Sequence, residues 1–297
     1  VGVGSAKVDR VASSRRVAVE SGKIVSRSST CGDKKLRDMP EGLIDPCLKT
    51  ITFARGETPL VRLHYYATHP QTRYHIDVAG SDVAGMARDA VEQSEGVPQI
   101  YFTGCAGDVA MGKYNDGSDT ARKGLAERLT AGIKASIAAT RYAPAGAVKW
   151  RTFDLRLTPR TDAGFSIEDC LATLKDPKLA MSRRLTRGAL CLVFHERCKS
   201  PVELSSLRIG NVFILHLPGE PMVHYQLYAQ RLRPDCFVAV AGYGDGGPAY
   251  ICTKKAFSDK GGYEQNASNV VPETETALKN AIAALLGAES ASKAECR

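Results

Sequence analysis

Runs of apolar residues alternate with amphipathic segments along most of this chain. Five runs bounded by turn residues predict β-strands: "LVRLHYYA" at 60–67, "QIYFTG" at 99–104, "VKWRTFDLRL" at 148–157, "LRIGNVFILHL" at 207–217 and "CFVAVAG" at 236–242. Apolar residues at helical spacing predict helices between and after them: one behind Ser81 and Asp82, one behind Ser118 and Asp119, one beginning at Pro221, and one that stops at Gly287. Strands and helices therefore alternate.

This alternation predicts an α/β layered fold in which a central mixed or mostly parallel sheet is flanked by helices. Periodicity is weaker in residues 1–50 and 159–200, and the segment 176–190 has the pattern of an inserted helical excursion. We see no internal repeat and no low-complexity tract. We therefore expect a single domain over residues 1–297.

Composition and charge argue against a membrane-spanning protein and against a nucleic-acid-binding protein. The chain has 43% hydrophobic and 24% charged residues, which is ordinary for a soluble globular protein, and no apolar run is long enough to span a bilayer. The net charge is +8, but Lys and Arg are scattered, whereas nucleic-acid footprints concentrate on one helix or stripe. We expect no nucleic-acid partner, while attraction to anionic surfaces or substrates stays open.

Polar residues follow three of the predicted strands. His69 follows the strand at 60–67, Glu220 the strand at 207–217, and Tyr250 lies beyond the strand at 236–242. Ligand crevices of α/β sheets lie beyond the carboxyl ends of strands, and a catalytic zinc takes about three protein ligands such as imidazole and carboxylate. His69 stands directly before Pro70, and a lone histidine in that position at a strand end is more often a turn or core residue than a metal ligand. No short metal motif such as HExxH decides between them.

Other candidates for chemistry are weaker. The chain lacks GxSxG and phosphate-loop motifs, and "VGVGSAK" at 1–7 follows no strand. Cys105 has no assignable partner histidine, so a nucleophilic role is not favoured. We expect Asp108 to cap a turn and His64 to be packed, and His75 is an alternative metal ligand in an exposed loop.

Five segments, in order along the chain, resemble the catalytic domain of the neutral (alkaline, non-lysosomal) ceramidase family. They are "ATHP" at 67–70, "GSDVAG" at 80–85, "GCAGD" at 104–108, "LRIGNVFILHLPGE" at 207–220 and "GYGDGGPAYICTKKAFSDKGGYE" at 242–264. The resemblance covers roughly residues 20–275. It implies a zinc-dependent amidase in which metal-activated water attacks the amide of an N-acyl sphingolipid or a similar substrate.

The resemblance also implies roles for individual residues. The family holds zinc with two histidines, a glutamate and a tyrosine, and His69, Glu220 and Tyr250 match the second histidine, the glutamate and the tyrosine. Tyr263, in "GGYE", matches the tyrosine that assists the tetrahedral intermediate. Arg27, in "SRSS", is the match for the arginine near the site. A lipid substrate further implies peripheral contact with a membrane, and the family implies a secreted or otherwise extracytoplasmic location.

The chain also departs from the family pattern. The family's first zinc histidine lies in an upstream His-x-His segment, yet no histidine precedes His64. We also expect no equivalent of the family's carboxy-terminal sandwich domain. The chain starts at Val1 with a polar segment, so we expect it to be an N-terminally truncated piece. Two alternatives stay open: a metal-free binding module with the same fold, and a metal-dependent hydrolase of another amide.

Overall fold

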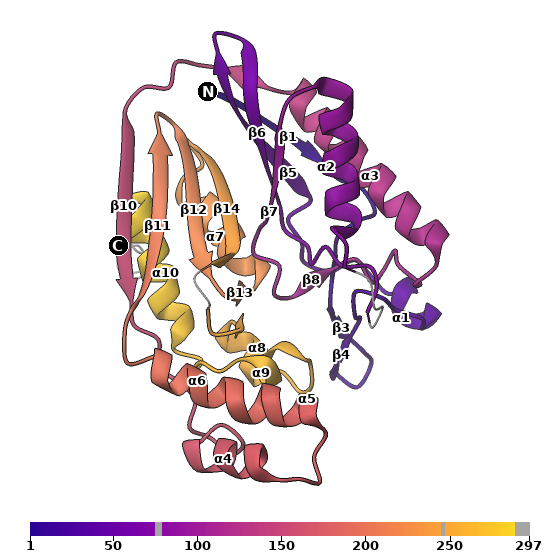
Figure 1. Cartoon of the computed structure of the whole chain (residues 1–297), viewed down its shortest axis with the longest axis vertical. Coiled ribbons are helices and arrows are strands. Elements are labelled where there is room, and N and C mark those ends of the chain that lie inside the picture. The colour runs from indigo at the N-terminus through magenta and orange to yellow at the C-terminus, as the bar shows by residue number, and fades with distance from the viewer. Residues whose placement is uncertain (75–78, 245–246, 289–297) are drawn as a thin grey trace.

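Two β-sheets stack face to face between two pairs of helices, so the molecule has four layers (Figure 1). The computed structural model describes residues 1–74, 79–244 and 247–288. Helices α2 (Asp82–Glu95) and α3 (Asp119–Ala138) cover the outer face of the first sheet. Helices α7 (Val223–Leu232) and α10 (Thr274–Leu286) cover the outer face of the second.

Both sheets are mixed. The first has the order β7-β6-β5-β1-β9, and its strands are β1 (Gly2–Lys7), β5 (Cys47–Arg55), β6 (Thr58–Tyr66), β7 (Gln99–Thr103) and β9 (Arg141–Tyr142). The second has the order β10-β11-β12-β14, and its strands are β10 (Val148–Leu155), β11 (Val202–Ile209), β12 (Val212–Pro218) and β14 (Phe237–Gly244). The pairs β6–β7 and β12–β14 are parallel, and the other pairs are antiparallel. The predicted α/β layered class is confirmed, with two central sheets where the sequence indicated one.

The two halves of the chain follow the same path. In the first half, β1 pairs with β5, β5 pairs with β6, α2 crosses over to the parallel strand β7, and α3 follows. In the second half, β10, β11, β12, α7, β14 and α10 repeat this order and these pairings. The chain therefore contains a structural repeat that no sequence period reveals.

Side-chain alternation explains the layers. Successive residues of a strand point to opposite faces, and here both faces are covered. Ile51 and Tyr65 of the first sheet meet Ile214 of the second in the core between the sheets. Their neighbours point outward, as Tyr66 does toward α2 and α3 and Phe213 toward α7 and α10. The strands consequently read as nearly continuous apolar runs.

Three local predictions need correction. The run at 207–217 is a hairpin of β11 and β12, because Gly210 adopts a positive φ of 58° and reverses the chain. Pro221 lies in the short strand β13 (Glu220–Pro221), and α7 begins at Val223. The polar start of the chain forms β1, a strand inside the first sheet.

Short elements surround the ends of the large strands. They are β2 (Ser13–Ser14), β3 (Arg16–Ala18), β4 (Ile24–Ser26), α1 (Lys34–Asp38), β8 (Val109–Ala110), β15 (Tyr250–Ile251), α8 (Lys254–Ser258) and α9 (Glu264–Ala267). Among the described residues, no helix is both long and apolar enough to cross a membrane.

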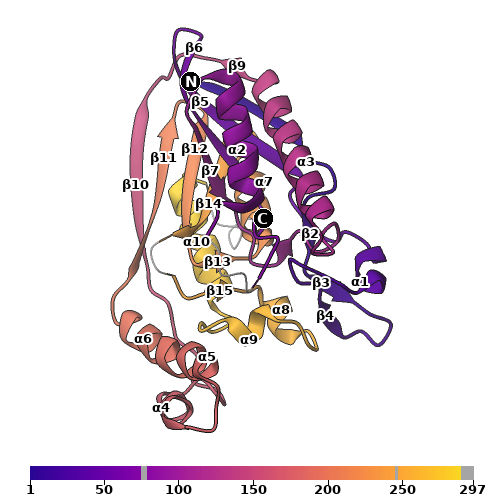
Figure 2. The same cartoon turned by 45° about the vertical axis from the view of Figure 1, so that its right-hand side comes forward.

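An inserted helical excursion joins β10 to β11. It comprises α4 (Ile167–Lys175), α5 (Met181–Arg183), the π-helical turn η1 (Arg184–Ala189) and α6 (Leu190–Arg197). Figure 2 shows that it projects from one end of the molecule, beyond the layered body. The predicted helical character of this segment is confirmed.

Candidate active site

Three of the five predicted site residues meet where β6 and β12 end. His69 follows β6, Glu220 follows β12, and Tyr250 opens β15. The His69 Nε2 lies 2.9 Å from Oε2 of Glu220 and 3.5 Å from the hydroxyl of Tyr250. Since both strands run in the same sense within equivalent halves, their carboxyl ends deliver one side chain each to a shared position. The structure thus brings together residues that are far apart in sequence.

A two-residue parallel ladder places Glu220 beside Tyr250. In the pairing of β13 with β15, Glu220 lies opposite Tyr250, and the amide N–H of Glu220 donates to the carbonyl of Ala249 over 2.8 Å. Gly107 packs against the other side of this ladder and donates its N–H to the carbonyl of Pro221. A Cβ on Gly107 would lie only 2.4 Å from the carbonyl oxygen of Glu220, so the site requires glycine there.

Strand β8 fixes the imidazole of His69. The backbone N–H of His69 donates to the carbonyl of Val109, and Nδ1 lies 3.0 Å from the same oxygen. A carbonyl oxygen only accepts, so Nδ1 carries a proton and Nε2 faces the Glu220 carboxylate. A ring nitrogen and a carboxylate oxygen 2.9 Å apart need a proton or a metal cation between them.

The donors of this cluster fit a small metal ion. Among the described residues, no group of three or more His, Cys, Asp and Glu side chains could hold a metal. The further oxygen donors beside His69 are the phenols of Tyr243 and Tyr250, whose hydroxyls lie 3.3 and 3.5 Å from its Nε2. Ligand atoms at about 2.0–2.2 Å from a tetrahedral zinc lie roughly 3.4 Å from one another. The separations of 2.9 and 3.5 Å are close to that spacing. Nitrogen and oxygen donors at this spacing are of the kinds that zinc takes in proteins.

Arg15 is a site residue that sequence reasoning missed. Its Nη1 donates to the Tyr250 hydroxyl over 3.1 Å, and its guanidinium carbon lies 5.0 Å from the ring centroid of Tyr263. Burial raises the pKa of Tyr250 by more than the neighbouring Arg15 lowers it. Without a bound metal, the Tyr250 side chain is therefore a neutral phenol. The only sequence signal was the Arg15-Arg16 pair, which reads as a local charge cluster.

Two contacts hold Arg15 in place. The pairing of β2 with β8 brings its backbone N–H onto the carbonyl of Asp108 over 2.7 Å. Its Nε lies 3.7 Å from Oε1 of Glu264, a carboxylate that is fully buried and also accepts from Arg16. The cation therefore faces a buried counter-charge on one side and the aromatic site on the other.

Arg27, which the resemblance matched to the arginine near the site, has a different environment. The residue is 1% exposed, and its guanidinium donates to backbone carbonyls of the surrounding loops: those of Ser14, Leu36, Met39, Pro40 and Glu41. These bonds use the N–H groups of both Nη atoms, so the side chain has a structural role. The structure places Arg15, not Arg27, beside Tyr250, because β2 carries Arg15 directly to β8.

Tyr263 borders the cluster from the solvent side. It precedes α9, its ring stands perpendicular to that of Tyr250 at 5.4 Å, and 46% of the residue is exposed. A cavity of about 280 Å³ opens here, lined by Arg15, Ser26, Ser28, Gln71, Tyr74, Tyr250 and Tyr263. A polar reacting group could enter this cavity and meet the arginine and both tyrosines.

Tyr243 is the second residue that sequence reasoning missed. Its hydroxyl lies 3.3 Å from Nε2 of His69, and the two rings are perpendicular. Its backbone adopts a positive φ of 65°, which is costly for a residue with a bulky side chain and is typical of functional sites. Burial and the Glu220 carboxylate raise its pKa, so it is a neutral hydrogen-bond donor. The "GYGDGG" stretch was the available signal.

The weaker candidates have structural roles. Cys105 is fully buried and burial raises its pKa, so its thiol is not an activated nucleophile. Asp108 has a structural role, but it accepts the N–H of Val223 at the start of α7 and not an N–H of its own turn. His64 is buried between Thr50 and Gln99, as predicted for a packed residue. His75 lies outside the described residues.

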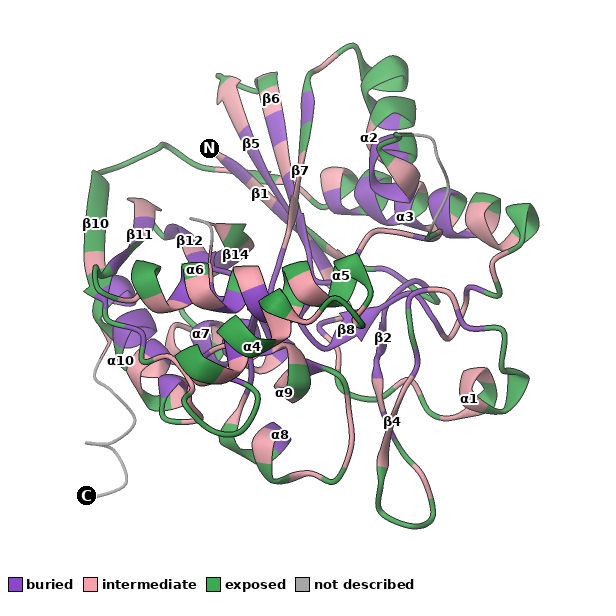
Figure 3. Cartoon of the chain, turned by 60° about the horizontal axis from the view of Figure 1, so that its bottom comes forward, coloured by how far each residue is buried: buried purple, intermediate pink, exposed green. Residues whose placement is uncertain are grey.

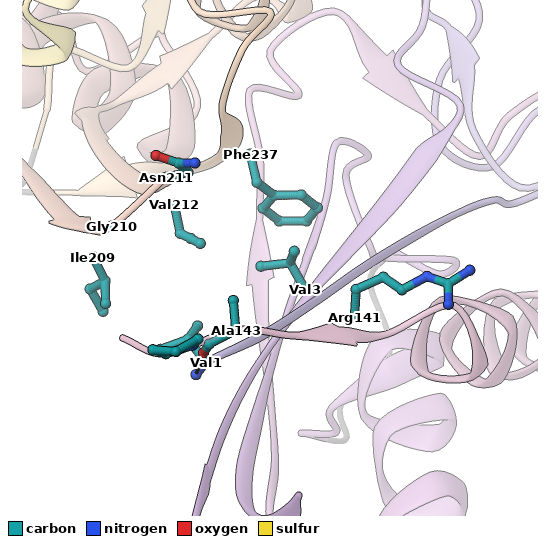
Figure 4. A pocket seen from close by; sticks show the side chains of 10 residues that line it. Val1, Val3, Arg141, Ala143, Ile209, Gly210, Asn211, Val212 and Phe237 are labelled. Carbon is teal, nitrogen blue, oxygen red and sulfur yellow. Dashed lines mark hydrogen bonds between the residues drawn. The ribbon is translucent and has the colours of Figure 1, made fainter. Parts of the chain in front are cut away.

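A different cavity lies at the other end of the sheets. It has a volume of about 370 Å³ and is lined by Val1, Val3, Arg141, Ala143, Pro144, Ile209, Gly210, Asn211, Val212 and Phe237 (Figure 4). Val212 and Phe237 begin β12 and β14, whereas Glu220 and Tyr243 lie at the opposite ends of these strands. This cavity is therefore separate from the His69 cluster.

Comparison with solved structures identifies the fold. The crystal structure of neutral ceramidase from Pseudomonas aeruginosa matches 95% of this chain and 52% of its own length, with a TM-score of 0.64 and 14% identity. A ceramidase complexed with C2 matches 97% of this chain and 54% of its own length, with a TM-score of 0.65 and 15% identity. No family model and no curated protein sequence matches the chain. The expected likeness to neutral ceramidase is confirmed for the fold, and the chain spans about half the length of these structures.

Proposed function

We propose that this protein is a zinc-dependent amide hydrolase that acts on an N-acyl lipid. The observation that carries the proposal is the 2.9 Å approach of His69 Nε2 to the Glu220 carboxylate, with the Tyr250 phenol beside it. This approach needs a proton or a metal cation between the two atoms, and the nitrogen and oxygen donors of the cluster are suited to zinc. The likeness to ceramidase structures supports an amide substrate.

The donor cluster would hold the metal. Glu220 supplies an anionic oxygen, His69 supplies a ring nitrogen oriented by the Val109 carbonyl, and Tyr250 supplies a phenol oxygen. A zinc ion bound there would polarise an amide carbonyl and lower the pKa of water.

The residues around the cavity would bind and orient the amide. Arg15 and Tyr263 face the cavity from two sides, and both carry donors that could meet negative charge developing on a carbonyl oxygen. Arg15 is already oriented by Glu264 and by the β2–β8 pairing, so it would need little reorganisation during the reaction. Tyr263 is half-exposed and lies where substrate would enter.

Two substitutions in the full-length protein separate these roles. Glu220→Ala removes a metal donor and should lose zinc and activity together. Tyr263→Phe removes only a hydroxyl and should retain zinc while kcat falls by about 10²–10³, the usual cost of one oxyanion donor. Zinc content by elemental analysis and kcat on a short-chain N-acyl amide are the measurements.

Each result has a definite meaning. Zinc retained in Glu220→Ala, or an unchanged kcat in Tyr263→Phe, contradicts the assigned roles. A wild-type protein with neither zinc nor hydrolytic activity favours a binding module with this fold. Zinc with hydrolysis of peptide or sugar amides, and none of lipid amides, favours a hydrolase of another substrate class.

A further inference from the structure

The helical excursion exposes a stripe of large apolar side chains. Met181, Leu185, Leu190 and Val193 are each between 49% and 61% exposed. Single exposed apolar residues are normal on a protein surface, but several on consecutive turns of one small element are not. Figure 3 looks onto this end of the molecule, where α4, α5 and α6 lie in front of the body with exposed residues on their outer side.

The π-helical turn keeps these side chains on one face. Met181 and Leu185 are four residues apart, and Leu190 and Val193 are three apart, as on one side of an α-helix. The step from Leu185 to Leu190 is five residues, which would turn away in a regular α-helix. Residues 184–189 form i→i+5 hydrogen bonds, and this wider turn brings Leu190 back toward the side of Leu185.

Basic residues outnumber acidic ones in the excursion. Residues 167–199 contain seven Lys and Arg side chains and four carboxylates. Among the carboxylates, Glu196 is paired with Lys199, and Asp169 and Asp176 accept the backbone N–H groups of Gly164 and Lys178. The excursion therefore combines an apolar stripe with a net positive charge, the pattern of helices that lie at the boundary between anionic headgroups and acyl chains.

The excursion is also attached beside the candidate site. Arg160 donates to the carbonyl of Gln265 over 2.7 Å, and Pro159 bridges to Val270. Phe165, Arg187 and Asn266 line one shared surface pocket. Gln265 and Asn266 belong to α9, which begins directly after Tyr263. A surface bound by the excursion would thus lie next to the entrance that Tyr263 borders.

We propose that the helical excursion docks the protein on an anionic lipid surface. The apolar stripe enters the acyl boundary, and the flanking Lys and Arg side chains contact the lipid phosphates. A second copy of this chain is a poorer occupant, because it would bring two equally basic surfaces together. This docking goes beyond the proposed hydrolase function, since lipid binding needs neither zinc nor a reaction.

The test is sedimentation of the purified protein with vesicles. Wild type should bind vesicles of equal phosphatidylcholine and phosphatidylglycerol, bind vesicles of phosphatidylcholine alone much more weakly, and lose affinity as salt is raised. The double variant Leu190→Gln, Val193→Gln should bind at least about tenfold more weakly. A matched control, Leu43→Gln with Leu60→Gln, changes two side chains that are each 53% exposed elsewhere and should bind like wild type.

Three results would overturn the proposal. The first is absence of wild-type binding to the anionic vesicles, and the second is equal binding by wild type and the excursion variant. The third is a wild-type protein that binds no vesicles but forms a concentration-dependent dimer in light scattering, with the dimer lost in the excursion variant. Failure of the hydrolase proposal is distinguishable: Glu220→Ala should bind vesicles like wild type, and the excursion variant should keep its zinc content and its kcat on a soluble short-chain amide.

Discussion

A single methyl group at Gly107 tests whether the position of Glu220 sets activity. In Gly107→Ala the new Cβ would lie 2.4 Å from the Glu220 carbonyl oxygen, whereas ordinary contacts begin at 3.4 Å. The β13 backbone must therefore move by about 1 Å, because the obstructing atom is backbone and cannot rotate away. A displacement of this size at a catalytic group costs about 10²-fold in rate, and overpacking costs about 1–3 kcal/mol of stability.

The assay compares kcat/KM on a short-chain N-acyl amide with urea unfolding of the same preparations. Gly107→Ala should lose about 10² in kcat/KM and remain folded at assay temperature. Gly32→Ala is the matched control, because a Cβ there meets nothing within 4 Å, and it should match wild type in both measurements. Equal kcat/KM and equal stability in Gly107→Ala and wild type would refute the packing argument.

Two further predictions concern buried cations and bases. Burial lowers the pKa of His64 from 6.5 to about 4, so the folded protein keeps this histidine neutral where the unfolded chain would protonate it. The free energy of unfolding should therefore be unaffected by His64 above pH 6.5 and should fall by about 3 kcal/mol as the pH is lowered from 6.5 to 4. In urea unfolding, His64→Gln should lose less stability than wild type over this pH range, and an equal loss would contradict the argument. Arg15→Lys keeps the positive charge near Glu264 but loses the planar guanidinium that bonds Tyr250, so kcat should fall by about 10² with zinc retained. Arg27→Lys should lower the free energy of unfolding and leave the kcat of the folded protein unchanged. The reverse pattern would assign the site role to Arg27.

Much of the fold follows from local sequence chemistry. The helices α3 and α10 were predictable because Ser118 accepts the N–H of Ala121 at the first start, and Gly287 adopts the left-handed conformation at the second end. Strand β1 was not predictable, because it is built from small residues. A Cβ on Gly4 would lie 2.0 Å from the Ser136 carbonyl oxygen, so the close approach of α3 excludes the apolar side chains that usually mark a strand.

The site was predictable only in part, for a related reason. The rule that ligand crevices lie beyond the carboxyl ends of strands made His69, Glu220 and Tyr250 candidates, and the family resemblance gave each a role as a metal ligand. Arg15 reaches the site through the two-residue pairing of β2 with β8, between segments about a hundred residues apart. Such a short ladder leaves no periodic pattern in the sequence. The position of the Tyr243 side chain depends on a positive φ that tyrosine does not favour, so it could not be expected from the sequence.

The repeated path of the two halves gives the site an unusual dependence. His69 belongs to the first half, and Glu220 and Tyr250 belong to the second, so neither half contains the full set of donors. The halves meet through the core between the sheets and through the neighbouring edge strands β7 and β14. A slight hinge-like opening along this seam would separate the donors while each sheet kept its own hydrogen bonds. The proposed activity therefore depends on how tightly the two halves are closed, and it would be lost before circular dichroism registered any loss of secondary structure.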